Sequence, residues 1–231
     1  MARKLGWIFG GAAFLVFVHL WWRAAALGPF PGRYLINPNF PLAIVWDLAL
    51  MIFFAASHSL FASHWFKRRR KRPPQLERQV FLILNFITVA FVWMYWAPLP
   101  GPALWQIEGA PSLIFHAIQL LGLVGFSWTV RYFHLASFFG EKPETGKLEF
   151  SGPFALCRHP SYFFGILLLL SPQMPLGRAI LAFSAMAYMV VGSHLEERKL
   201  LAEAGESYAR YRRKTPWLIP TPASFRAAFF Q

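Results

Sequence analysis

The sequence contains a single cysteine, Cys157, and only ten acidic residues against 23 lysines and arginines. One cysteine excludes a disulfide within the chain, and no Cys and His pairs have the spacing of a zinc site. No GxGxxG or P-loop pattern occurs, and no polar stretch is long enough for a doubly wound nucleotide-binding sheet. Any nucleotide-like ligand must therefore be held between helices.

Long apolar runs, in contrast, dominate the chain. Apolar residues make up 56% of its 231 positions, more than the surface of a water-soluble domain of this size tolerates. A helix needs about 20 apolar residues to cross roughly 30 Å of hydrocarbon. Four runs reach that length, namely 5–27, 42–66, 80–98 and 112–133. Because no small-residue cleavage site follows the first run, we interpret it as a retained span.

A fifth apolar run, 162–171, is stopped by Pro172 and Pro175, which break a helix. At ~1.5 Å per residue this run is too short to cross the bilayer by itself. We therefore predict a partly inserted hairpin, whose second arm, 176–195, continues as an exposed helix. The predicted fold is an all-α polytopic membrane bundle of four full spans, this Pro-broken hairpin and a cytoplasmic amphipathic helix.

This bundle is predicted to form one domain over residues 1–231. Its predicted parts are the four spans in 1–140, the hairpin and C-terminal helix in 141–220, and a tail in 221–231.

The cations predict the orientation of the chain in the membrane. Lysine and arginine gather at the N-terminus, in 67–78, in 142–158 and from Arg198 onward. The positive-inside rule then puts both termini in the cytoplasm, in agreement with an even number of crossings. We expect a bacterial inner membrane, or the endoplasmic reticulum or nuclear membrane of a eukaryote. The net charge of +13 is explained by topology and anionic headgroups, so the bilayer is the expected partner and nucleic acid is not.

One polar cluster stands at the mouth of the hairpin. Its members are Arg158, His159, Pro160, Tyr162, Glu196, Glu197 and Tyr208. Cations and carboxylates are costly beside hydrocarbon, so such a cluster is a candidate functional site. Its mixture of a cation, carboxylates and aromatic faces suits a charged ligand. No obligate protein partner is evident.

The same region carries a family resemblance. Its elements are Gly152-Pro153-Phe154, Arg158 to Tyr162, Gly165, Glu196-Glu197, Leu200, Gly205, Tyr208, Tyr211 and Pro216 to Pro220. They resemble the C-terminal signature of integral-membrane S-adenosylmethionine methyltransferases, shared by isoprenylcysteine carboxyl methyltransferases and phospholipid methyltransferases. Further elements are Asp47, Ser57-His58-Ser59-Leu60, Trp96-x-Pro98-x-Pro100, Trp105 and Phe138-x-Gly140. These are similar to the methanethiol S-methyltransferase and nurim-like branch.

The resemblance implies methyl transfer from S-adenosylmethionine, with S-adenosylhomocysteine as product. The acceptor would be a small, methanethiol-like thiol, or a membrane-borne group such as an isoprenylcysteine carboxylate, at the cytoplasmic interface. Arg158 can form a forked pair with the carboxylate of the methyl donor. Glu196 or Glu197 can accept from its ribose hydroxyls or amine, and Tyr162 can contact the adenosine. Pro160 is expected to keep His159 out of the helical region and to start the hairpin arm.

Two histidines are the catalytic candidates. His58 lies inside the second span, where an ionisable side chain is costly, and it can favour the thiolate of an acceptor. Relatives in this branch commonly have an amide residue just before this histidine, whereas this chain has Ser57. His134, at the inner end of the fourth span, can close the cofactor pocket. No metal is expected, because the seven histidines are spread over five predicted elements.

Structural interpretations remain beside these. Arg158 could contact lipid phosphate only, and His58 could simply bond to a neighbouring helix. His116 and Gln119 are expected at helix–helix contacts. The alternative function is a nurim-like structural membrane protein without catalytic activity. The intact motif with both glutamates favours the enzyme.

Overall fold

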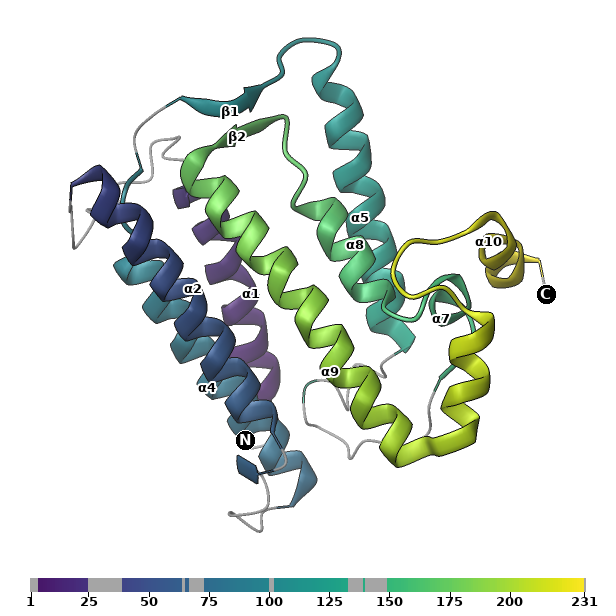
Figure 1. Ribbon diagram of the computed structural model, residues 1–231. Helices are drawn as coiled ribbons and strands as arrows, with labels where there is room; N and C mark the ends of the chain where they lie inside the picture. Colours follow the sequence, from purple (N-terminus) through teal and green to yellow (C-terminus); the bar gives the residue numbers. More distant parts are fainter. Residues whose placement is uncertain are drawn as a thin grey trace. The chain divides into compact units, whose positions relative to one another are not determined.

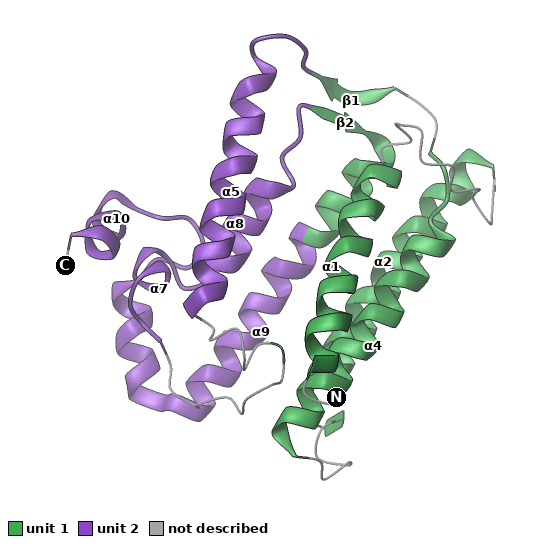
Figure 2. Cartoon of the chain, turned by 180° about the vertical axis from the view of Figure 1, so that it is seen from behind, with its two compact units in different colours: residues 1–106, 136–144, 173–185 green, residues 107–135, 145–172, 186–231 purple. Residues whose placement is uncertain are grey.

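The computed structural model describes residues 4–24, 39–63, 65–66, 73–99, 102–132, 139 and 149–230 (Figure 1). The described chain is almost entirely helical, which confirms the predicted all-α membrane bundle. The chain divides into two compact units (Figure 2). Unit 1 comprises 1–106, 136–144 and 173–185, and unit 2 comprises 107–135, 145–172 and 186–231.

Five helices have the length and apolar composition of membrane spans. They are α1 (Leu5–Ala24), α2 (Phe40–Ala62), α4 (Pro74–Tyr95), α5 (Ser112–Tyr132) and α9 (Leu176–Lys214). The first four coincide with the four predicted spans, and α9 is the second arm of the predicted hairpin. Helix α4 begins before the apolar run, because Pro74 fits the first turn of a helix.

In unit 1, α1 and α2 both pack against α4. The buried core includes Leu20 from α1, Leu50 from α2 and Val92 from α4. Trp93 of α4 also donates its indole N–H to His19 Nδ1 of α1, at 2.6 Å. Apolar packing and hydrogen bonds between spans together hold this three-helix group.

Asp47 is fully buried in unit 1 and has a structural contact. Its Oδ1 accepts the backbone N–H of Ala97 at 2.9 Å, so it fixes the segment that follows α4. The preceding residue, Trp46, donates its indole N–H to the carbonyl of Tyr95 at 2.9 Å. Asn39 caps α2. Asp47 therefore links α2 to the segment after α4, and it does not cap α2.

A short antiparallel sheet was not predicted. Strand β1 (Ala103–Gln106) pairs with β2 (Gln173–Pro175), with Gln106 opposite Gln173. Strands of four and three residues, one of them ending in proline, leave too little alternation for a sequence pattern to reveal. β1 lies between α4 and α5, and β2 lies between α8 and α9. The pairing therefore joins the α4–α5 connection to the α8–α9 connection.

The hairpin has the predicted short first arm. Helix α8 (Pro160–Leu168) has nine residues and α9 has 39, with non-helical angles inside α9 only at Gly205. In unit 2, α8 packs against α5, where a Cβ at Gly125 would overlap the ring of Phe164. Gln119 of α5 donates to the carbonyl of Leu168 at 3.2 Å, which confirms its predicted helix–helix contact. Helices α7 (Pro153–Leu156) and α10 (Pro222–Phe229) and the part of α9 from Met186 onward complete unit 2.

Candidate functional site

The backbone of Arg158 and His159 is held by α8, which directly follows it, and by the segment after α9. Pro160 is the first residue of α8, and His159 lies just outside it with φ −123° and ψ 63°, as predicted. The backbone N–H groups of Arg158 and His159 donate to the carbonyls of Pro216 and Trp217, at 2.9 and 3.2 Å. The segment that follows α9 therefore returns and holds the backbone of this dipeptide in place.

Glu197 joins the two side chains of that dipeptide. Its Oε1 lies 3.2 Å from Arg158 Nε and 3.1 Å from His159 Nε2. The side chains of Arg158 and Glu197 are only 11% and 9% exposed. Such a pair is retained beside hydrocarbon only if both charges find partners, so Glu197 acts mainly as the internal counter-charge.

Glu196 occupies a different environment, because its side chain is 48% exposed. Its Oε2 accepts the phenolic O–H of Tyr162 at 3.4 Å and lies 3.7 Å from His159 Nδ1. The Tyr162 ring stacks on the His159 ring, with centroids 5.5 Å apart and planes within 6°. Helices α8 and α9 thus bring five of the predicted site residues together in unit 2.

Arg158 retains hydrogen-bonding capacity. Its Nη1 is buried and has no hydrogen-bond partner within the part of the chain that the structure describes. A buried N–H group without an acceptor costs free energy, and more so when it is charged. The donor set of this cluster therefore fits an anionic group of a ligand beside Arg158.

Burial sets the protonation of two neighbouring groups. It lowers the pKa of the His159 imidazole below its usual value, although Glu196 and Glu197 oppose the shift. His159 is therefore neutral at neutral pH. Burial also raises the pKa of the Cys157 thiol to about 12, so this cysteine stays protonated and is not a nucleophile.

Tyr208 lies beside this cluster and is buried. Its ring centroid is 5.7 Å from that of Tyr211, whose hydroxyl donates to the carbonyl of Phe154 at 2.7 Å. The charges of Glu197 and Arg158 both act on the Tyr208 hydroxyl. The tyrosine pair joins the end of α9 to α7 beside the charged groups of the cluster.

Trp217 is a site residue that the sequence analysis did not single out. Its indole N–H donates to Ser193 Oγ at 3.1 Å, and its ring stacks on His194 with centroids 4.6 Å apart. Ser193 in turn donates to the carbonyl of Val190 at 2.7 Å. Only its position directly after Pro216, in an otherwise basic segment, distinguished this tryptophan in the sequence.

His58 lies in unit 1, whereas the cluster lies in unit 2 and far from His58 in the sequence. Its Nδ1 is 2.5 Å from Oδ1 of Asn85 in α4, and Asn85 Nδ2 donates to the carbonyl of Phe81 at 2.8 Å. This bond between α2 and α4 is the contact with a neighbouring helix that the structural interpretation of His58 predicts. It leaves the catalytic role of His58 a prediction. Asn85 was not predicted as a contact residue, although a polar residue within an apolar run is a signal for a contact between helices. His134 lies outside the described residues.

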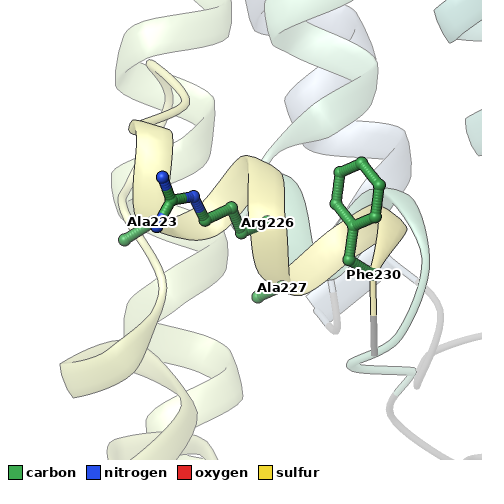
Figure 3. A pocket seen from close by; sticks show the side chains of 4 residues that line it. All are labelled: Ala223, Arg226, Ala227 and Phe230. Atoms are coloured by element: carbon green, nitrogen blue, oxygen red, sulfur yellow. The ribbon is translucent and has the colours of Figure 1, made fainter.

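A shallow pocket lies on α10, away from the predicted residues in sequence. It is lined by Ala223, Arg226, Ala227 and Phe230 (Figure 3). Among the residues that the structure describes, no three His, Cys, Asp or Glu side chains form a group that could hold a metal ion.

Three curated relatives resemble the chain over most of its length. Methanethiol S-methyltransferase 2 of Bradyrhizobium diazoefficiens is 31% identical over 218 residues, 84% of this chain and 83% of the relative. The methanethiol S-methyltransferase of Mycobacterium tuberculosis is 28% identical over 242 residues, 96% and 98% of the two chains. That of Crocosphaera subtropica is 30% identical over 193 residues, 77% and 75% of the two chains.

Nurim of Bos taurus is 31% identical over 87 residues, which is 37% of this chain and 33% of nurim. No family model and no solved structure matches the chain. The extensive likeness to the methyltransferases agrees with the membrane-spanning helices and with the motif residues that converge in unit 2. The chain belongs to the methanethiol S-methyltransferase family and is an integral-membrane methyltransferase.

Proposed function

We propose that this enzyme transfers a methyl group from S-adenosylmethionine to a small thiol of the methanethiol type. The names of the relatives support the thiol. The observation that carries the methyl donor is the buried Nη1 of Arg158, which lacks a partner among the described residues and stands in a cluster with two glutamates. The site of a zwitterionic ligand needs both a positive and a negative side chain.

The roles of the cluster follow from exposure and existing contacts. S-adenosylmethionine supplies an electrophilic methyl group on a sulfonium, together with a carboxylate, an amine, a ribose and an adenine. Arg158 would hold the carboxylate through a charge-assisted hydrogen bond. Glu196, which is half exposed, would accept from the amine or the ribose hydroxyls. Tyr162 would contact the adenosine, while Glu197 keeps Arg158 and His159 in place.

Methyl transfer to sulfur asks little acid–base chemistry of the protein. Proximity, alignment and exclusion of water can together supply ~7 to 11 kcal/mol. A thiol near pKa ~8.5, the value of cysteine, needs only modest help to form the thiolate, whereas an alkyl thiol such as methanethiol needs more. His58 remains the residue predicted to favour the thiolate, His134 remains predicted to close the cofactor pocket, and Tyr208 remains a predicted contact of the donor. A mutation series on these residues would test each role.

The membrane topology belongs to the same proposal, with both termini in the cytoplasm. The β1–β2 pairing supports it, because the α4–α5 and α8–α9 connections then lie on one side of the bilayer. Nine residues of α8 reach roughly 14 Å, and the four that follow, of which Leu169 is still helical, can add roughly 11 Å, which approaches the hydrocarbon thickness. With the five longer helices, this makes an even number of crossings.

The decisive experiment joins ligand binding to turnover on the detergent-purified full chain. Calorimetry would measure binding of S-adenosylmethionine and S-adenosylhomocysteine, and headspace gas chromatography would measure dimethyl sulfide formed from methanethiol. We expect binding and turnover by the wild type, and loss of both in Arg158→Ala. The Lys199→Ala variant, which removes an exposed cation on α9, is the matched control and should behave like the wild type.

Two outcomes would contradict the proposal in different ways. Donor binding without turnover of methanethiol, but with turnover of an isoprenylcysteine or a longer thiol, would overturn the acceptor and keep the donor. No binding of either ligand by the purified full chain, together with no turnover, would overturn the donor site. It would favour the structural role suggested by the nurim likeness, which covers little more than a third of the chain.

A further inference from the structure

The C-terminal helix α10 exposes an unusual surface for a segment outside the spans. Phe225, Phe229 and Phe230 are 50%, 51% and 79% exposed, and Ile219 just before the helix is 74% exposed. Large apolar side chains gathered in one short segment mark a surface that contacts lipid or protein. The helix is nevertheless well defined, because Thr221 and Ser224 form a reciprocal capping box at its start.

The position of α10 within unit 2 indicates the depth at which this surface lies. The Phe229 ring is 5.2 Å from the ring of Trp128, which belongs to the last turns of the membrane span α5. Tryptophan near the end of a span is typical of the headgroup region. Because Phe229 contacts Trp128 directly, α10 lies at the level where hydrocarbon meets the lipid headgroups.

Charge indicates the kind of lipid. Arg226 is the one ionisable side chain of α10, and no acidic residue occurs after Glu206 in the sequence. Arg226 lines the shallow pocket with Ala223, Ala227 and Phe230, at the i, i+3, i+4 and i+7 spacing of one helix face (Figure 3). A cation set in an apolar face is arranged to reach a phosphate while its neighbours enter the lipid.

We propose that α10 is an interfacial helix that docks on an anionic phospholipid surface, with Arg226 at a headgroup phosphate. The phenylalanines enter the outer part of the hydrocarbon. α10 also packs against α7, which leads through Cys157 directly into Arg158. Lipid docking of α10 therefore sets the height of α7 relative to the membrane surface.

The test uses the full chain in nanodiscs of phosphatidylcholine, alone or mixed with phosphatidylglycerol. An environment-sensitive fluorophore is attached to Ala223→Cys on α10 and, as the matched control, to Ala202→Cys on the exposed face of α9. Cys157 is fully buried, so labelling of the wild type gives the background. Lipids with a nitroxide in the headgroup or deep in the acyl chain report the depth of the label.

We expect the Ala223 label to be quenched by the headgroup nitroxide more than the Ala202 label, and more strongly with phosphatidylglycerol present. Arg226→Gln should lower the preference for phosphatidylglycerol roughly fivefold, as expected for one cation near an anionic surface. Phe225→Ser with Phe230→Ser should reduce quenching in both lipids while circular dichroism stays unchanged. Equal quenching of the two labels would overturn the docking, and quenching indifferent to phosphatidylglycerol in the wild type would overturn the anionic headgroup.

Discussion

At the scale of single residues, adjacent glutamates have separate tasks. Glu197 is buried between Arg158 and His159, whereas Glu196 is half exposed beside Tyr162. Successive residues of a helix point about 100° apart, so one turn of α9 can present one acid to the protein and the other toward solvent. The pair therefore combines an internal counter-charge with a group that is accessible to a ligand.

Replacing Arg158 by lysine tests the guanidinium itself. Lysine keeps the charge but cannot direct separate nitrogens at Glu197 and at a ligand carboxylate. Because a hydrogen bond to a charged group contributes ~1.5 to 3 kcal/mol, we expect Arg158→Lys to weaken S-adenosylhomocysteine binding about tenfold to a hundredfold. Calorimetry measures this change. An affinity equal to that of the wild type would show that charge alone suffices.

Replacing Trp217 by phenylalanine tests the segment that holds the motif. Phenylalanine retains a ring to stack on His194 but removes the indole N–H that bonds Ser193. We expect Trp217→Phe and Ser193→Ala each to weaken donor binding about fivefold, the effect of one hydrogen bond of ~1 kcal/mol. The double variant should be no weaker than either single one, because both remove the same bond. Additive losses would contradict the link.

At the scale of elements, packing between α5 and α8 depends on two glycines. A Cβ at Gly122 would lie 2.9 Å from the backbone of α8, and one at Gly125 would overlap the Phe164 ring. Small residues let helices approach closely where apolar burial gives no driving force. This contact fixes α8, and hence the positions of His159, which directly precedes the helix, and of Tyr162 in its first turn.

We expect Gly125→Ala to destabilise the protein by ~1 to 3 kcal/mol, the usual cost of overpacking a fitted contact. Gly11→Ala in α1 is the matched control, because nothing lies within 4 Å of its added Cβ. That control should be neutral or stabilising, since glycine inside a helix costs ~0.5 to 1 kcal/mol relative to alanine. Thermal unfolding in detergent compares the two. An equal response would refute close packing at Gly125.

At the scale of the whole molecule, the short sheet supports the proposed topology of the hairpin. The pairing of β1 with β2 requires the α8–α9 connection to reach the side of the α4–α5 connection. Cysteines introduced at Glu108 and Gln173 should therefore react with an impermeant maleimide from the same side of the membrane. A cysteine at Glu203 should react only from the other side. Labelling of Glu108→Cys and Gln173→Cys from opposite sides would contradict the pairing.

Much of the bundle was predictable because its signals are local. The four spans follow from runs of apolar residues, and Pro172 and Pro175 shorten the first hairpin arm whatever surrounds them. Pro160 likewise fixes the start of α8 and keeps His159 out of the helical region. These features depend on chain length, hydrophobicity and proline geometry, which the sequence determines by itself.

The partners of the site residues required the tertiary structure. Nothing local distinguishes Glu197 from Glu196 as the counter-charge of Arg158, or identifies Asn85 as the partner of His58 and Trp217 as the support of the motif. Each of these contacts joins residues far apart in the chain and depends on how two elements meet. The sequence therefore determined where helices form and where charge is concentrated, and three-dimensional packing decided which of those charges face one another.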